Sequence, residues 1–266
     1  MPDGFAAGVG AVAHVLLPDG WDGPVGGDVV LEGAEGHHLA RVRRIRAGET
    51  VTVADGRGRW WLTETAGVKA GRVVLRACGP TVTEPQLQPP LTVAFALGKA
   101  DQPTFVVHAC TELGADRLVP WVAARSVVRP GPGRAEALRA RLQRVARAAT
   151  GQCRRARLPV VEPVTGIEDV AGRPGLLVAA PGGTSPTSLG PPPEAGWCLV
   201  SGPEGGFDAT ETRLLAAAPR VGLGPFVLRA LTAPVVGTAV LRAIGAATVR
   251  SGGGHDATDP VGEEAE

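Results

Sequence analysis

Two patterns of hydrophobic and polar positions follow one another along this chain. Up to residue 78, short runs rich in β-branched residues alternate with turns, and they predict strands at Val12–Leu17, Asp28–Leu31, Thr50–Ala54, Arg59–Thr65 and Gly71–Ala77. Asp55-Gly56 stands between two of these runs, and this dipeptide is a strong hairpin signal. The first part of the chain is therefore predicted to be a small β-barrel-like domain.

One segment of this part has a helical spacing instead. Leu39, Val42 and Ile45 recur every three residues, which predicts a short helix over residues 37–45. The other face of this helix would carry a group of basic side chains, namely Arg41, Arg43, Arg44 and the nearby Arg46.

From residue 79 on, the pattern changes. Residues 79–90 contain four prolines and little periodicity, so they are predicted to be a linker. Apolar runs then predict strands at Leu91–Leu97, Arg117–Val122, Leu158–Val164, Gly175–Ala180, Trp197–Ser201 and Val221–Leu223. Helical spacing predicts helices at Pro103–Leu113, Arg134–Thr150, Asp208–Ala218 and Thr232–Arg250.

Alternating apolar strands and helices indicate an α/β fold with a parallel sheet covered on both faces. We therefore expect a first domain over residues 1–78, a linker over 79–90 and an α/β domain over 91–250. Residues 251–266 hold five acids and no Lys or Arg, which predicts a disordered acidic tail. In an open parallel sheet, ligands bind at the carboxyl ends of the strands.

The charge of the chain changes in meaning once this tail is set apart. The whole chain carries 27 basic and 26 acidic residues, a net charge of +1. Without the tail, 27 bases face 21 acids, a net charge of +6, and all bases except Lys69 and Lys99 are arginines. A genome rich in G and C would also raise the arginine content. Eight arginines with one acid between residues 134 and 157 nevertheless favour a nucleic-acid partner, because arginine pairs well with phosphate.

Several classes of protein are disfavoured by composition. The four cysteines (Cys78, Cys110, Cys153 and Cys198) form no CxxC pair, so we expect no zinc site and no disulfide framework. The histidines show no metal-ligand spacing, and we predict no metal. The chain has no signal-peptide pattern and no apolar run of the roughly 20 residues that a membrane helix needs. These features predict a soluble, cytoplasmic protein without a membrane partner.

Two loops of the α/β part could carry chemistry. A strand ending at Ser201 is followed by Gly202-Pro203-Glu204-Gly205-Gly206, and Asp208 with Glu211 forms the pattern of a capping box for the next helix. Glycines at this place let a ligand approach the backbone, although a plain Gly-Pro turn would look the same.

The second loop begins at Leu223-Gly224-Pro225 and carries a single charge, Arg229, before Thr232, which is placed to cap the last helix. Taken alone, Arg229 could be an ordinary surface residue. Because both loops follow parallel strands, they are predicted to meet at one edge of the sheet, which favours a functional role.

The chain resembles the bacterial 16S rRNA (uracil-N3)-methyltransferases, the RsmE family of the SPOUT superfamily. The resemblance runs over roughly residues 12–250 and is carried by HHLARVRRIRAGE (37–49), FALGKAD (95–101), TELGAD (111–116), GQCRRARLP (151–159), LVSGPEGGFDATE (199–211) and LGPFVLRALTA (223–233). It implies a PUA-like RNA-binding domain, a SPOUT α/β domain with a deep trefoil knot, and a homodimer. It also implies transfer of a methyl group from S-adenosyl-L-methionine to N3 of a uridine in 16S rRNA of the small ribosomal subunit.

The same resemblance implies the site residues. Those expected to bind the cofactor are Ala180, Pro181, Val200, Gly202, Pro203, Glu204, Gly205, Gly206, Leu223, Gly224, Val227, Leu228, Thr232 and Ala233. Arg229, Thr232 and Glu204 are the expected catalytic residues, with Arg229 stabilising the uridine anion. RNA contacts are expected from His38, Arg41, Arg43, Arg44, Arg125, Arg154, Arg155 and Arg157.

The chain departs from the commonest family pattern at four positions. Ala109, Gly151, Phe226 and Leu231 stand where Lys, Glu, Arg and Glu are usual. Two other functions therefore stay open: an RNA-binding assembly factor with weakened catalysis, and a methyltransferase of the same scaffold that acts on a different RNA site. The general base and the target nucleotide are not identified by these motifs.

Overall fold

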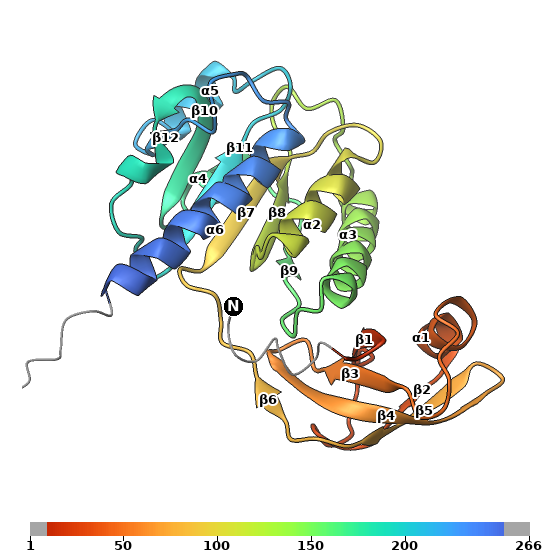
Figure 1. Cartoon of the computed structure of the whole chain (residues 1–266). Helices are drawn as coiled ribbons and strands as arrows, with labels where there is room; N and C mark the ends of the chain where they lie inside the picture. Colours follow the sequence, from red (N-terminus) through yellow and green to blue (C-terminus); the bar gives the residue numbers. More distant parts are fainter. Residues whose placement is uncertain (1–9, 253–266) are drawn as a thin grey trace, which may run out of the picture.

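The computed structural model describes residues 10–252, which form two sheets (Figure 1). The first sheet contains β1 (Ala13–Leu16), β2 (Val29–Leu31), β3 (Thr50–Ala54), β4 (Arg59–Lys69), β5 (Arg72–Ala77) and β6 (Val82–Thr83). Its order is β1-β3-β4-β5-β2, with β6 paired to β4. Only the β1–β3 pair is parallel. The strand β6 lies inside the segment predicted to be a linker, so that segment is not free of regular structure.

The predicted hairpin at Asp55-Gly56 is confirmed. The Asp55 carboxylate accepts hydrogen bonds from the backbone N–H groups of Arg57 (2.7 Å) and Arg59 (2.9 Å), and it pairs with the Arg59 guanidinium at 2.7 Å. Those contacts lower the pKa of Asp55, although burial acts against them as the largest single influence. Gly56 and Gly58 have positive φ, as the turn requires.

The helical segment of the first domain differs from its prediction. The helix α1 begins earlier, at Gly33–His37, and continues into a π-helical turn at His38–Val42. The wider turn breaks the three-residue spacing, because the N–H of Ile45 reaches back to the carbonyl of Leu39. Leu39 and Ile45 are consequently buried, whereas Val42 is exposed.

The second sheet is wholly parallel, as predicted. It contains β7 (Leu91–Ala96), β8 (Arg117–Trp121), β9 (Val160–Val161), β10 (Leu176–Thr184), β11 (Trp197–Ser201) and β12 (Arg220–Val221), in the order β12-β10-β11-β7-β8-β9. Its helices are α2 (Gln102–Glu112), α3 (Pro132–Gln152), α4 (Ile167–Ala171), α5 (Ala209–Leu214) and α6 (Thr232–Gly252), with a 3₁₀ turn, η3, at Pro186–Ser188. The strand predicted at Leu158–Val164 shrinks to two residues, α5 ends four residues early, and α4 was not predicted.

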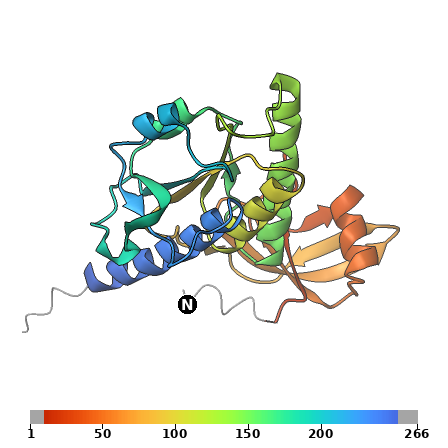
Figure 2. The ribbon, with the colours of Figure 1, turned by 90° about the horizontal axis from the view of Figure 1, so that it is seen from above.

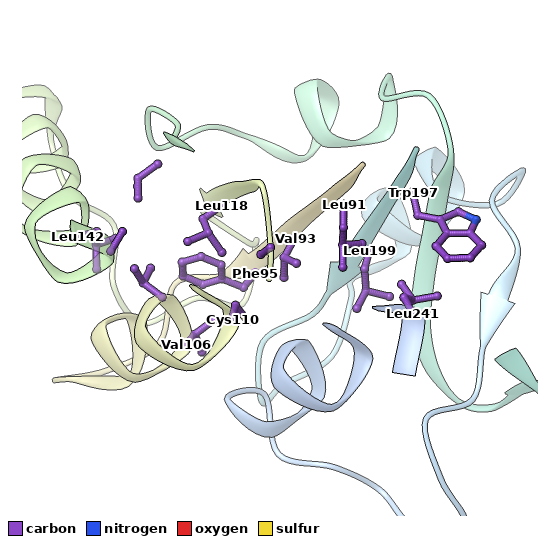
Figure 3. Packing of buried hydrophobic residues seen from close by; sticks show 14 of the residues in the cluster. Leu91, Val93, Phe95, Val106, Cys110, Leu118, Leu142, Trp197, Leu199 and Leu241 are labelled. Atoms are coloured by element: carbon purple, nitrogen blue, oxygen red, sulfur yellow. The ribbon is translucent and has the colours of Figure 1, made fainter. Parts of the chain in front are cut away.

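Helices cover both faces of this sheet. On one face, α2, α3 and α6 pack over Val93, Phe95 and Leu199, and Figure 3 shows Leu241 of α6 beside Leu199. Gly237 of α6 lies so close to Leu199 that a Cβ atom there would be 2.2 Å from a leucine methyl carbon. On the other face, α4 and Leu215, which directly follows α5, belong to one buried cluster with Trp121 and Val200.

The two sheets are joined through α3, which lies beside β1 in Figure 1 and Figure 2. The Arg147 side chain of α3 is largely buried and donates to the carbonyls of Leu16 and Leu17, and it pairs with Glu35 at 3.2 Å. The backbone carbonyl of Arg155 lies 3.0 Å from a ring nitrogen of His14. The arginines of this region therefore hold the first sheet against the second.

Candidate functional site

A cavity of about 520 Å³ opens at the carboxyl ends of β10, β11 and β12. Its size falls within the range of small-molecule sites. Both loops singled out in the sequence line it, so the prediction that they meet at one sheet edge is confirmed.

The first wall of the cavity is the loop of residues 202–206, and Glu211 of the following helix α5 fixes its position. The Asp208 carboxylate accepts from the N–H of Glu211 and the Glu211 carboxylate accepts from the N–H of Asp208, both at 2.8 Å, which confirms the capping box. The other Glu211 oxygen accepts from the N–H of Ala124 at 2.5 Å. A buried carboxylate thus ties this loop to the loop after β8.

Two further contacts hold the same wall. The Arg125 guanidinium donates to the carbonyl of Gly205 at 2.6 Å. The rings of Phe207 and Trp121 are stacked, with centroids 5.9 Å apart. Gly202 packs closely against this ring, since a Cβ atom there would lie 3.1 Å from it. These contacts fix the loop of residues 202–206 as a cradle in the cavity wall.

The second wall is an irregular part of β10. Ala179 and Thr184 both align with Val221 of β12, so the four residues between them, 180–183, bulge out of the ladder. At the base of the bulge, Gly183 and Gly222 touch through their backbones, because a Cβ on Gly183 would lie 2.6 Å from the Gly222 nitrogen. Ala180 and Pro181 are thereby placed in the cavity wall.

The third wall is the loop between β12 and α6. The carbonyl of Arg229 accepts from the N–H groups of Thr232 (2.9 Å) and Ala233 (3.0 Å), which fixes the backbone at the start of α6. The Arg229 side chain is exposed and lines the cavity. Within residues 10–252 its guanidinium forms no hydrogen bond or ion pair, so it can bind a ligand.

Most of the residues that were expected to hold a cofactor come together in this cavity. Those lining it are Ala180, Pro181, Gly202, Pro203, Glu204, Gly206, Leu223, Gly224, Val227, Leu228 and Ala233. Val200 lies in the core beneath it. Gly205 of the glycine loop and Thr232, the first residue of α6, do not line it.

The structure adds residues that were not among the expected site residues. Ser201, Phe207 and Arg220 also line the cavity, as does Phe226, one of the four departures from the family pattern. Ser201 is buried, and within the described residues its hydroxyl has no hydrogen-bond partner. Phe207 directly follows the glycine loop, so its place in the sequence could have identified it as a site residue. Arg220 precedes the second loop in a strand, and nothing in the sequence pattern indicated it.

Neither Cys110 nor Cys198 lines this cavity. Burial raises the pKa of Cys110 to about 12 and that of Cys198 to about 11, so both thiols are protonated at neutral pH. Over residues 10–252 no group of three or more His, Cys, Asp or Glu side chains could hold a metal ion. The available groups are backbone N–H and carbonyl groups, apolar walls, and the charges of Glu204, Arg220 and Arg229.

Seven of the eight side chains expected to bind RNA fall into two groups, and the eighth, Arg125, donates to the glycine loop. His38, Arg41, Arg43 and Arg44 are exposed on the α1 side of the first sheet. Arg155 and Arg157 are largely occupied elsewhere: Arg155 donates to the carbonyls of Thr111 and Ala115, and Arg157 donates to those of Arg57 and Glu84.

Arg154 donates to the carbonyl of Ala11 at 2.8 Å. Arg154 and Arg157 thus reach across the junction to the first part of the chain, whereas the acceptors of Arg155 lie at the end of α2 and just after it. Buried carbonyls in both places need donors, and the guanidinium groups supply them. The contacts of these three arginines with RNA stay a prediction.

No helix within the described part of the chain is both long and apolar enough to cross a membrane. The disordered tail expected over residues 251–266 lies almost wholly outside the described residues.

Comparisons with known proteins bear on both sheets. A family model described as an RNA methyltransferase domain matches residues 85–242, and one described as an RNA methyltransferase PUA domain matches residues 31–78. The ribosomal RNA small subunit methyltransferase E of Mycobacterium bovis is 38% identical over 246 residues, which cover 88% of this chain and 90% of that protein. The Bacillus subtilis protein of the same name is 28% identical over 77% of this chain and 86% of its own length.

A solved structure has the same architecture. The ribosomal RNA small subunit methyltransferase E of Neisseria gonorrhoeae, bound to S-adenosyl methionine, has a TM-score of 0.77 at 24% identity. The match covers 87% of this chain and 97% of that chain, so it extends over both sheets.

Proposed function

Because this chain belongs to the RNA methyltransferase family, among the ribosomal RNA small subunit methyltransferases E, we propose that it methylates N3 of a uridine in 16S rRNA with S-adenosylmethionine as the donor. The observation that carries this proposal is the cavity at the carboxyl ends of β10, β11 and β12, which both glycine loops line.

The residues of the cavity fit this donor. Apolar walls from Leu223, Val227 and Leu228 suit an adenine ring, and the glycine cradle leaves backbone groups accessible to the polar parts of the molecule. The unpartnered Ser201 hydroxyl offers one more polar group. When bound, S-adenosylmethionine supplies a methyl group on a positively charged sulfur, which is activated toward a nucleophile.

The protein must make the uridine a nucleophile. N3 of uridine carries a proton at neutral pH, and its loss leaves a negative charge on the base. The unpaired Arg229 guanidinium is positioned to stabilise that charge, and the backbone bonds of its carbonyl to Thr232 and Ala233 fix its place in the cavity. Glu204 also lines the cavity, while Thr232 acts through its backbone contact with Arg229.

The RNA face is proposed to include His38, Arg41, Arg43 and Arg44, which are exposed on the first sheet. Arg125 is proposed to hold the glycine loop and to contact RNA with the exposed part of its side chain. We propose that the first domain spans residues 1–78 and serves RNA binding, and that the second spans residues 91–250 and holds the cavity.

We further propose the trefoil knot, the homodimer and the cytoplasmic location that the family resemblance implies. The path of α6 supports a knot, since this helix contacts η3 as well as the strands β7 and β11. Sedimentation of the purified protein tests the dimer.

A direct experiment tests the function. Small ribosomal subunits from cells that lack this gene are incubated with the protein and labelled S-adenosylmethionine, and the modified nucleotide is identified by mass spectrometry. The expected result is one N3-methyluridine in 16S rRNA. If the protein binds S-adenosylmethionine and subunits but transfers nothing, the assembly-factor function takes its place; a methyl group elsewhere would assign a different RNA site.

A further inference from the structure

Phe226 is exposed in a place where an aromatic ring is unusual. Its side chain is 81% exposed, whereas Trp61, Trp121 and Phe95 are fully buried. A ring exposed in the wall of a cavity offers apolar surface that a bound ligand can cover, which favours binding.

The position of this ring is specific. Phe226 lines the cavity from the loop between β12 and α6, the same loop that presents Arg229 three residues later. Both side chains project from a loop that is anchored at its end by the contacts of the Arg229 carbonyl. The cavity therefore has a free apolar ring and a free cation on one wall.

We propose that Phe226 forms the acceptor-base subsite, on which an unstacked pyrimidine of the RNA lies while Arg229 faces its polar edge. This inference rests on the proposed function. A base that is to be methylated at N3 must leave its stack and its pairing partner, and aromatic side chains stabilise such bases by stacking. A cation beside the ring adds the charge that the base needs when it loses its proton.

A second copy of this chain is the competing occupant, because an exposed apolar side chain also suits a protein interface. The unpaired Arg229 on the same wall favours the base, since a guanidinium buried without a partner in a protein interface would be costly. The two occupants give different results in the experiment below.

The experiment compares Phe226→Leu, Phe226→Ala and Phe226→Trp with the wild-type protein. Leucine keeps an apolar side chain without a ring. Loss of methyl transfer with leucine and its retention with tryptophan would therefore show that stacking on a ring is needed. Phe105→Ala is the matched control, since Phe105 is 51% exposed on α2 and does not line the cavity. Calorimetry with S-adenosylmethionine, sedimentation, and methyl transfer to small subunits are measured for each protein.

We expect Phe226→Leu and Phe226→Ala to lose about tenfold or more in kcat/KM for small subunits, with the affinity for S-adenosylmethionine and the sedimentation mass unchanged. Phe226→Trp keeps the activity, and small subunits quench the fluorescence of its new exposed indole. Full activity of Phe226→Leu, or a fall in mass on loss of the ring, would overturn the subsite. If the wild-type protein itself neither binds the donor nor transfers a methyl group, the proposed function fails instead.

Discussion

Glu211 is a sensitive point of the candidate site, although it does not line the cavity. Its buried carboxylate accepts one backbone hydrogen bond from Ala124 at 2.5 Å and another from Asp208 at 2.8 Å. Glutamine at this position would keep one accepting oxygen and turn an N–H₂ group toward a backbone donor. We therefore expect Glu211→Gln to lose one charge-assisted bond, to weaken the other and to place two donors against each other.

The magnitude follows from these contacts. A hydrogen bond to a charged group contributes about 1.5–3 kcal/mol, and Ala124 is exposed enough for water to replace part of that. We expect the free energy of unfolding to fall by about 2–4 kcal/mol, which in a protein of this size lowers Tm by on the order of 10 °C. Because Glu211 fixes residues 202–206, the affinity for S-adenosylmethionine should fall as well.

Urea unfolding and calorimetry with the donor measure these two effects. Asp208→Asn is the matched control in the same capping box, because asparagine keeps an oxygen for the N–H of Glu211 and should cost under about 1 kcal/mol. If Glu211→Gln is as stable as Asp208→Asn, the carboxylate does not hold the two loops together and the reasoning is refuted.

Three other predictions concern the mechanism, the junction and the pH dependence. Arg229→Ala should lower the rate of methyl transfer at least about 100-fold and leave the calorimetric affinity for S-adenosylmethionine within about twofold; comparable activity would remove Arg229 from the mechanism. Arg147→Ala should lower the free energy of unfolding in urea by about 3 kcal/mol, because the Leu16 and Leu17 carbonyls and Glu35 lose their donor. The control Arg144→Ala should lower it by less than about 0.5 kcal/mol, and equal losses would contradict the role of Arg147. Burial lowers the pKa of His14 from 6.5 to about 4, so the protein should lose up to about 3 kcal/mol of stability as the pH falls from about 6.5 to about 4. His14→Gln should reduce this loss when the free energy of unfolding is measured over the same pH series. If the variant depends on pH as strongly as the wild-type protein, other groups cause the loss.

The pattern of the chain was sufficient for the elements that are long or that have clear end signals. The strand Trp197–Ser201 was predicted without error because both faces of the sheet are covered, which makes the run continuously apolar. The capping box at Asp208 was equally readable, because its two partners are three residues apart.

The rest depended on contacts between distant parts of the chain. The bulge at residues 180–183 exists because β10 pairs with β12, some 40 residues later, and no local pattern contains that pairing. The π-helical turn at His38–Val42 moved Val42 to the surface for a similar reason, since Leu39 and Ile45 are held by the core of the first sheet. The arginines near residue 155 were visible as charge, but their acceptors are carbonyls elsewhere in the fold.

Those junction arginines have a consequence for how the protein responds to salt. At this junction Arg147 donates to the carbonyls of Leu16 and Leu17 as well as to the carboxylates of Glu35 and Asp19, and Arg157 donates to the carbonyls of Arg57 and Glu84. Dissolved ions have little effect on the bonds to neutral carbonyls, because these acceptors carry no charge to screen. Contacts between exposed arginines and phosphate weaken steeply with ionic strength. Concentrated salt should therefore release RNA from the exposed arginines that are proposed to bind it, while the two sheets keep their relative placement. Arginine would then serve two purposes in this protein: RNA binding that salt weakens, and a contact between the sheets that salt leaves intact.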